Sequence, residues 1–324
     1  MRRLKTVALA ASFAFAAIGM STAAHAEWPE RAVTVIVPWS AGGGTDATAR
    51  AVAQQLEKRL GQPFNVVNRT GGGGLIGHLA ITNAKPDGYT LGVITIESTM
   101  YAAQGTRGAG PDDFTMIGRF NADPIGYNVK ADASYDDMKG LIAAVKKNPG
   151  KIKASGANRG GLSHLAWAGL LNKLGIDPNA SPWVASDGSA PALQELAAGA
   201  IDVVSTSPAE ARTLVEAGKA KTLAIAANEQ SDAYPDLPTM PEALGIKWAP
   251  MPFRALAGPA GLPDDVVKKL SNALAATVKD PDFVKFMKSR GFSVAYQNGE
   301  EFKKTVKQDE EDLSKTMAVL GLAK

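Results

Sequence analysis

The sequence predicts an α/β protein built on parallel sheets. Over residues 33–96, strand-like and helix-like segments alternate. Residues 33–37 form a β-branched run typical of a buried strand, and residues 47–60 repeat apolar side chains at helical spacing. Glycine-rich turns stand between several of the strands and the helices that follow them. Strand, turn and helix repeated in this order are the units of a parallel sheet.

The same rhythm continues along the chain. The first helix is expected to end at Gly61, because glycine is a common helix stop. A crossing strand is expected at residues 120–130, between two groups of such units. Further strands are expected at residues 62–68, 89–96, 151–155, 183–184, 201–204, 221–227 and 292–296. Further helices are expected at residues 75–84, 135–147, 164–174, 264–278, 282–289 and 300–320, and others begin near Pro191 and Pro208.

The N-terminal residues predict a signal for export. Two arginines and a lysine stand among the first five residues, and residues 7–17 are apolar but too few to span a membrane. The Ala-His-Ala sequence at 24–26 fits a cleavage site, so residues 1–26 are expected to be removed. A retained membrane anchor is the alternative.

Composition excludes several classes of function. Residues 27–324 carry 32 Lys and Arg against 32 Asp and Glu, so the basic footprint of a nucleic-acid or membrane binder is missing. The chain has no cysteine, which excludes disulfides, thiolate metal sites and cysteine nucleophiles. The remaining histidines, His78 and His164, lack the spacing of metal ligands, and we expect neither a metal nor a cofactor.

The turn at residues 38–46 is the first candidate binding site. It holds three consecutive glycines and then Thr45 and Asp46, either of which can cap the first amides of the helix. Free N–H groups at the positive end of a helix form a site for an anion. The turn lacks the spacing of a nucleotide loop, and an ordinary strand–helix connection is the alternative. The glycine run at 71–74 could be a second anion loop, and we favour a tight turn.

Further loops repeat this arrangement. Residues 156–163 precede a helix for which Ser163 is the expected N-cap, and residues 185–189 and 205–207 precede two more helices. In open α/β sheets, loops of this kind gather at one edge and form the ligand crevice. His164 and Asp46 could form the acid–base pair of a hydrolase. We favour a structural histidine, because the chain lacks a nucleophile motif such as G-x-S-x-G.

Several motifs fall together in the order of a known family. They are PWSAGGGTD at 38–46, NR at 68–69, IG at 76–77, PDGYTL at 86–91, GSAPAL at 188–193, EAGK at 216–219 and PDLPT at 235–239. Through them the chain resembles the substrate-binding proteins of tripartite tricarboxylate transporters, called Bug or TctC receptors. The resemblance covers essentially all of the chain after residue 26.

The resemblance implies a periplasmic solute-binding protein with a two-lobed, type II Venus-flytrap fold. Each lobe is expected to be a mostly parallel sheet flanked by helices. Closure of the lobes captures a small organic carboxylate, which passes to the membrane subunits of the transporter without any catalysis. We expect lobe 1 to contain residues 27–122 and 229–324, lobe 2 to contain residues 123–228, and the protein to be a monomer.

The resemblance also implies that backbone amides, hydroxyls and ordered waters hold the ligand's carboxylate. The expected ligand-binding residues are Trp39, Ser40, Ala41, Gly42, Gly43, Gly44, Thr45, Asp46, Glu97, Ser98, Gly156, Ala157, Asn158, Arg159, Gly161, Leu162, Ser163, His164, Asp187, Gly188, Ser189 and Ser205.

Four of these residues leave the ligand's identity open. Trp39 belongs either to the core or to the cleft, where its ring would suit an aromatic or alicyclic carboxylate. Arg159 is either a carboxylate contact or a solvated charge. Glu97 and Asp187 favour a ligand that also carries hydroxyl or amino donors.

Two other functional classes are weighed against the receptor. One is a periplasmic enzyme that acts on a small carboxylate, which turnover of the ligand would reveal. The other is a ligand sensor for a signalling partner. Neighbouring genes for two membrane subunits would favour transport over sensing. Fold alone does not separate these classes, because function resides in the site.

Overall fold

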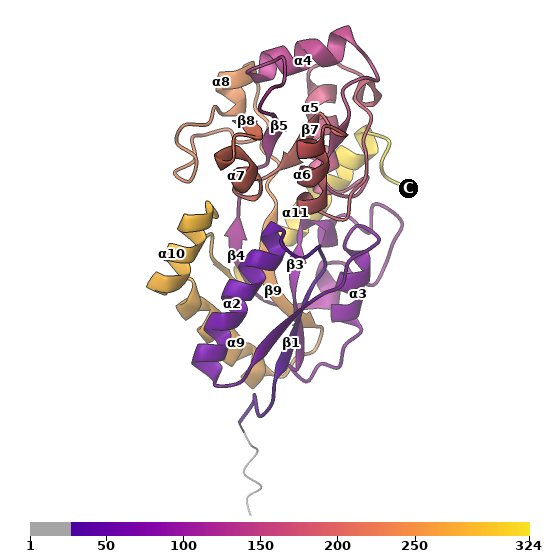
Figure 1. Cartoon of the computed structure of the whole chain (residues 1–324). Helices are drawn as coiled ribbons and strands as arrows, with labels where there is room; N and C mark the ends of the chain where they lie inside the picture. Colours follow the sequence, from indigo (N-terminus) through magenta and orange to yellow (C-terminus); the bar gives the residue numbers. More distant parts are fainter. Residues whose placement is uncertain (1–26) are drawn as a thin grey trace, which may run out of the picture.

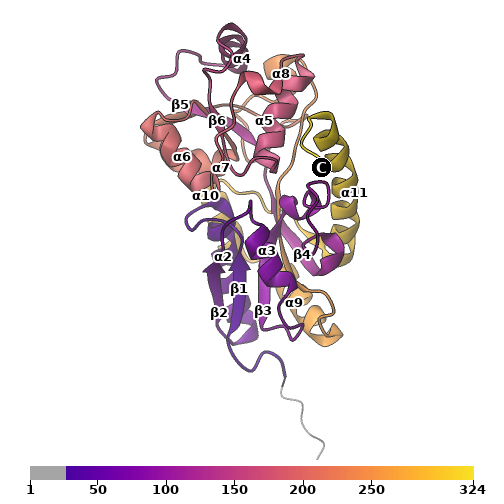
Figure 2. The same cartoon turned by 90° about the vertical axis from the view of Figure 1, so that its right-hand side faces the viewer.

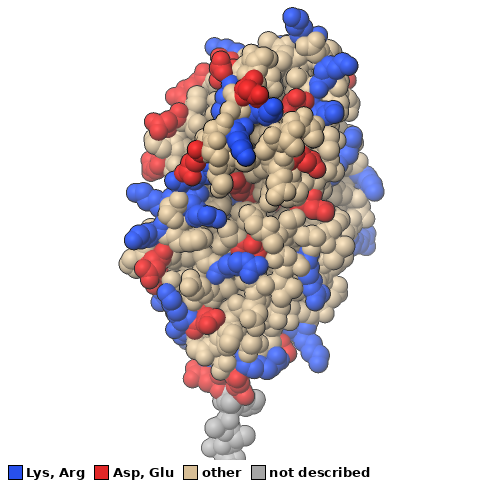
Figure 3. Space-filling model, in the orientation of Figure 1, with Lys and Arg blue, Asp and Glu red and all other residues tan. Residues whose placement is uncertain are grey.

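The structure is a computed structural model that describes residues 27–324, so the expected export signal and its cleavage site lie outside the described residues. The chain forms two lobes, each with its own sheet (Figure 1). Among residues 27–324, no helix combines the length and apolar character that a membrane crossing needs. Figure 3 shows acidic and basic side chains interspersed over the face in view.

The first lobe holds a six-stranded mixed sheet in the order β10-β4-β9-β3-β1-β2. Its strands are β1 (Val33–Val37), β2 (Phe64–Asn68), β3 (Thr90–Thr95), β4 (Phe114–Ala122), β9 (Phe253–Pro259) and β10 (Gln297–Asn298). β1 pairs in parallel with β2 and β3, whereas β9 runs antiparallel between β3 and β4. The expectation of a mostly parallel sheet is corrected here, because a returning strand enters the middle of the sheet.

Two helical layers cover this sheet. The helices are α2 (Gly44–Leu60), α3 (Leu75–Thr82), α9 (Asp264–Thr277), α10 (Pro281–Arg290) and α11 (Gly299–Val319), with short 3₁₀ turns at η1 (Ile96–Thr99) and η2 (Pro111–Asp113). Side chains alternate between the faces of a strand. Val35 therefore packs in the core with α2 and α9, and Ile36 packs in the core with α3 and α11.

The second lobe holds a four-stranded mixed sheet in the order β6-β7-β5-β8. Its strands are β5 (Gly126–Lys130), β6 (Ala154–Ser155), β7 (Val203–Thr206) and β8 (Ala220–Ile225). β6 and β7 are parallel, and β5 is antiparallel to β7 and β8. The expected strand at 120–130 is in fact two strands, because β4 ends in one sheet and β5 begins in the other.

The helices of the second lobe are α4 (Met138–Lys147), α5 (Leu162–Lys173), α6 (Ser189–Ala198), α7 (Pro208–Glu216) and α8 (Met240–Leu244), with a 3₁₀ turn at η3 (Pro178–Ala180). α5 is almost entirely buried, and Trp167 on it packs in the lobe's core. A helix buried on all sides is apolar all round, as the middle of α5, residues 165–171, is. Its first turn is thereby fixed at the junction between the lobes.

The chain passes from one lobe to the other after β4 and returns before β9. Met240 and Trp248 pack in the core of the second lobe, where the Trp248 Nε1 donates to the Ala166 carbonyl over 2.9 Å. We therefore propose that the return crossing lies at residues 249–252, later than the boundary expected at 228. Figure 2 shows α11 running along the side of the molecule; it packs on β4 and reaches α5.

Two further expectations about the elements are corrected. Residues 292–296 do not form a strand, and the strand that follows them and pairs with β4, β10, consists only of Gln297 and Asn298. β9 was not expected, because its Ala, Gly and Pro content is low in β propensity. All seven residues of β9 are nevertheless buried, since strands pair with it on both sides. The predicted stop of α2 is confirmed, with Gly61 at φ 73°.

Candidate functional site

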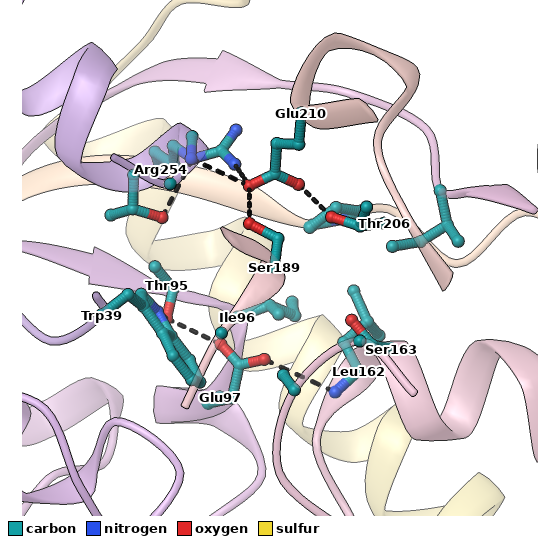
Figure 4. Close-up of a pocket in the computed structure, with 18 of the residues that line it drawn as sticks. Trp39, Thr95, Ile96, Glu97, Leu162, Ser163, Ser189, Thr206, Glu210 and Arg254 are labelled. Atoms are coloured by element: carbon teal, nitrogen blue, oxygen red, sulfur yellow. Dashed lines mark hydrogen bonds and ion pairs between the residues drawn. The ribbon is translucent and has the colours of Figure 1, made fainter. Parts of the chain in front are cut away.

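A cavity lies between the two lobes, and four helices begin at its wall (Figure 4). The starts of α2, α5, α6 and α7 contribute to the wall together with the end of β3 and the start of β9. Expected site residues that line it are Trp39, Ser40, Gly43, Gly44, Thr45, Glu97, Gly156, Ala157, Leu162, Ser163, Gly188 and Ser189. The cavity is also lined by residues that were not expected from the sequence, namely Thr95, Ile96, Ile125, Thr206, Glu210, Pro252, Phe253 and Arg254.

The amides of the three consecutive glycines before and at the start of α2 are bonded within the protein. The Gly42 N–H donates to Asp46 Oδ2 over 3.0 Å, and the Gly43 N–H donates to the Ser40 carbonyl over 3.3 Å. The Gly44 N–H donates to Glu210 Oε1 over 3.0 Å. The N-cap of α2 is Gly43, which has no side chain, so the expected cap at Thr45 or Asp46 is wrong.

Asp46 braces the turn instead of facing the cavity. Its carboxylate forms an ion pair with Arg50 at 2.8 Å and accepts from the Asn68 side-chain amide over 3.0 Å. Burial acts to raise the pKa of Asp46, but the hydrogen bonds from Arg50, Gly42 and Asn68 outweigh it and lower the pKa. The ionised carboxylate therefore fixes the loop from behind.

Glu210 and Arg254 join the lobes on one side of the cavity. Glu210, on α7, meets Arg254 Nη2 at 3.1 Å through the same Oε1 that accepts from Gly44. It also accepts from Ser189 over 2.8 Å and from the hydroxyl of Thr206. Burial acts to raise the pKa of Glu210, but the Arg254 charge and these hydrogen bonds lower it overall.

A sequence signal for Glu210 existed. Ser207 and Glu210 have the S-x-x-E spacing of a capping box, with Pro208 at the first helical position, and the structure forms this box. The pattern places an acid at a helix start that faces the crevice. Arg254 had no such signal, because it lies on the unexpected strand β9.

On the other side of the cavity, Trp39, Thr95 and Glu97 form a directed chain of hydrogen bonds. Trp39 Nε1 donates to Thr95 Oγ1 over 3.2 Å, and Thr95 Oγ1 donates to Glu97 Oε2 over 2.7 Å. The indole is a donor only, so the direction of the chain is fixed. Trp39 is 9% exposed and belongs both to the core and to the cavity wall. Burial raises the pKa of Glu97.

The loop before α5 supplies the facing wall. Its N-cap is Gly161 and not Ser163, so that expectation is wrong, although Ser163 does line the cavity. The Leu162 N–H donates to Glu97 Oε1 across the lobes over a long 3.5 Å. Two more contacts join the lobes here: Gln104 to the Gly160 carbonyl and Ser40 to the Asp187 carbonyl, each over 2.9 Å.

His164 is a structural residue of this loop. Its Nδ1 accepts from the Gly160 N–H over 3.0 Å, and its ring lies 4.8 Å from that of Trp183. Burial, with a smaller effect of the Arg159 charge, lowers the pKa of His164 to about 4. The ring is therefore neutral at pH 7. The acid–base pair considered for a hydrolase is not formed, because His164 Nδ1 bonds to Gly160, whereas Asp46 bonds to Arg50, Asn68 and Gly42.

The remaining expected residues lie outside the cavity wall. They are Ala41, Gly42, Asp46, Ser98, Asn158, Arg159, Gly161, His164, Asp187 and Ser205. Arg159 and Asp187 are exposed, and Arg159 lines a separate pocket with His164. Ser98 is buried and donates to the Thr95 carbonyl over 2.9 Å. Ser205 is buried, and its hydroxyl has no hydrogen-bond partner among the described residues.

A buried histidine supports the wall from behind. His78 Nε2 accepts from the Thr95 N–H over 3.2 Å, so the proton of the neutral ring is assigned to Nδ1, which lies 2.9 Å from the Gly74 carbonyl. Burial lowers the pKa of His78 to about 4. This neutral ring fixes the end of β3, where Thr95 and Glu97 face the cavity.

The wall has the chemistry of a binding site. In the part of the chain that the structure describes, it offers carboxylates, hydroxyls, backbone amides and one guanidinium, but neither histidine nor lysine. Helix starts and hydroxyl groups orient polar ligands through fixed donors.

Comparisons with known proteins agree on one family. A family model described as "Tripartite tricarboxylate transporter family receptor" matches residues 48–321. A UPF0065 protein of Bordetella pertussis is 30% identical over 298 residues, which cover 90% of this chain and 88% of that protein. The periplasmic binding protein BugD is 30% identical with a TM-score of 0.85, covering 91% of this chain and 99% of BugD.

A protein of R. palustris, solved with adipate, is 25% identical with a TM-score of 0.86. The match covers 92% of this chain and 99% of that one. The family-model match spans most of this chain, and the similarity to BugD extends over both lobes. The chain therefore belongs to the family of tripartite tricarboxylate transporter receptors, the Bug or TctC proteins, whose members are two-lobed periplasmic binding proteins.

Proposed function

We propose that this protein is a periplasmic receptor that binds a small organic carboxylate between its lobes. It delivers the ligand unchanged to the membrane subunits of a tripartite tricarboxylate-type secondary transporter. The observation that carries the proposal is the convergence of four helix starts, those of α2, α5, α6 and α7, on one cavity between the lobes. The positive end of each helix favours an anion there.

A family relationship and a related complex support the carboxylate class. The R. palustris protein with the same fold was solved with adipate, a dicarboxylate. Within residues 27–324, Arg254 is the one Lys or Arg side chain on the cavity wall. A densely charged phosphate ester would be expected to meet a cluster of arginines instead.

Closure of the lobes is the proposed mechanism of capture. The wall is contributed by both lobes, so a ligand bound there stabilises the arrangement in which they touch. The crossings at residues 123–125 and 249–252 are the proposed hinges, because the described chain runs from β4 to β5 through the first and enters β9 from the second. The protein is proposed to act as a monomer.

A thermal-shift screen followed by calorimetry tests the function. The panel contains aliphatic, aromatic and hydroxy acids, with amines and neutral sugars as controls. A ligand at 100 times its Kd adds about 2.7 kcal/mol to the free energy of unfolding. Mass spectrometry of the recovered ligand separates a receptor from an enzyme. Stabilisation by amines or sugars with no response to any carboxylate would contradict the proposal.

A further inference from the structure

Two acids of the protein itself reach across the cavity to the helix starts of the opposite lobe. Glu210 of the second lobe accepts from the Gly44 N–H of α2 over 3.0 Å. Glu97 of the first lobe accepts from the Leu162 N–H of α5 over 3.5 Å. Figure 4 shows the two carboxylates on opposite sides of the cavity. Each lies where the proposed function would place a carboxylate of the ligand.

The two acids differ greatly in how firmly they are held. Within the described chain, Glu210 has an arginine, three hydroxyls and two backbone amides as partners, from both lobes. Glu97 has a strong hydrogen bond from Thr95 and only the long contact to Leu162 across the lobes. Hydrogen bonds to charged groups are the strong ones in proteins, so removing Glu210 from its place costs far more than removing Glu97 from Leu162.

The nitrogens of Arg254 and the glycine amides beside Glu210 are already bonded within the protein. Arg254 directs Nε to Thr45 over 3.1 Å and Nη1 to Asn121 over 2.5 Å, while Nη2 meets Glu210. Asp123 lies 3.5 Å from the same guanidinium. The amides of Gly42 and Gly43 are bonded to other partners, as described above. An incoming carboxylate at the start of α2 would meet the Glu210 charge and no uncommitted arginine nitrogen.

The backbone at Gly44 is shaped for this side chain. A Cβ on Gly44 would lie 2.5 Å from Glu210 Oε1 and 2.5 Å from Arg254 Nη2, closer than any ordinary contact. Only glycine therefore lets the carboxylate and the guanidinium approach the helix start. Glu210 fits closely against Gly44, each nitrogen of its partner Arg254 is already bonded, and its hydrogen bonds come from both lobes. It is therefore a firmly held part of the wall while the lobes are closed.

We infer that Glu210 is an internal carboxylate that fills the anion site of α2 whenever the lobes are closed, so that the ligand of this receptor carries a single carboxylate, bound at the start of α5 in place of the Glu97 contact. This inference rests on the proposed function and narrows it to monocarboxylates. A second carboxylate at the α2 end would be repelled by Glu210, whose pKa is lowered by the Arg254 charge and by its hydrogen bonds, so that it is charged. Burial raises the pKa of Glu97, which favours its neutral form beside the α5 site.

Matched pairs of acids test the inference. Calorimetry with the purified protein compares hexanoate with adipate, butanoate with succinate, and benzoate with terephthalate. Wild type is expected to bind the monocarboxylate of the responding pair at least tenfold more tightly. Glu210→Ala, which removes the charge and opens space beside Arg254, is expected to shift the affinity ratio at least tenfold toward the diacid. Glu210→Gln, which removes only the charge, is expected to shift it in the same direction.

Glu216→Gln is the matched control, because Glu216 lies on the same helix but is exposed and pairs with Arg212 at the surface. Urea denaturation checks that each variant folds, and Glu210→Gln carries the test if the alanine variant does not. Tighter binding of the diacid by wild type, with a ratio unchanged in the Glu210 variants, would overturn this inference and leave the proposed function standing. Failure of every acid to bind wild type would overturn both.

Discussion

Replacing Gly44 by alanine tests whether the contact between the lobes depends on a bare backbone. The new methyl group would stand 2.5 Å from Glu210 Oε1 and 2.5 Å from Arg254 Nη2. Ordinary van der Waals contacts of a Cβ begin near 3.4 Å. Both side chains must therefore move by about 1 Å. The hydrogen bond from the Gly44 N–H to Glu210 lengthens, and Glu210 and Arg254 no longer meet at the start of α2.

The expected loss in the free energy of unfolding follows from the hydrogen bonds that this movement weakens. A hydrogen bond to a charged group contributes about 1.5–3 kcal/mol, and overpacking of this size typically costs about 1–3 kcal/mol. Glu210 keeps its partners within its own lobe, Ser189, Thr206 and Ser207, so only the contacts between the lobes are lost. Alanine also restricts the unfolded chain, which returns about 0.4–1 kcal/mol. Adding the two costs and subtracting this gain gives an expected net loss of about 1.5–5.5 kcal/mol.

Urea denaturation measures this loss, and Gly43→Ala is the matched control. Gly43 has φ −76°, and a Cβ there would lie 3.3 Å from the Ser40 carbonyl and 3.4 Å from Ser189 Oγ, a tolerable approach. That control should stay within about 1 kcal/mol of wild type, the ordinary scale of a change at an N-cap. Equal stability of the two variants would refute the argument from the Glu210–Arg254 contact.

Three further predictions address the turn, the buried histidine and the hinges. Gly43→Val should weaken ligand binding with the fold intact, and wild-type affinity of this variant in calorimetry would show that the turn is not part of the site. Asp46→Ala removes hydrogen bonds to a charged group and should lower the free energy of unfolding by about 1.5–3 kcal/mol. Wild-type stability of that variant in urea melts would show that the carboxylate does not hold the turn. The pKa of His78 is about 4 in the folded chain and 6.5 ordinarily. As the pH falls, the unfolded chain therefore takes up this proton before the folded chain does. Stability should therefore fall as the pH drops from 6.5 towards 4, by about 3 kcal/mol in total for this group. Urea denaturation of His78→Gln at a series of pH values should show a smaller loss of stability between pH 6.5 and 4 than in wild type. An equal loss in the variant would show that another group causes the pH dependence. Small-angle scattering should show compaction when a verified ligand is added, whereas identical profiles would argue against closure.

Much of the first lobe could be predicted because its local signals agree with its tertiary structure. The β-branched run of β1, the glycine turn and the stop at Gly61 each act within a few residues of the chain. β9 could not be predicted in this way. Its residues, Phe253–Pro259, gain strand structure from β3 and β4 on either side, and those partners lie far away in the sequence.

The candidate site likewise contains residues that local sequence predicts and residues that only distant segments bring in. Its glycine loops are local, so their part in the cavity wall followed from the spacing of strands and helices. Glu210 meets Gly44 across 166 positions of sequence, and Arg254 meets Thr45 across 209. The first contact forms only when the two lobes come together, and the second only when β9 enters the sheet of the first lobe, so the periodicity of the sequence indicates neither. The amides that make a glycine turn look like an open anion site are the same amides that a distant acid can fill. In this protein, the amide at the very start of α2 is therefore taken by an acid of the opposite lobe.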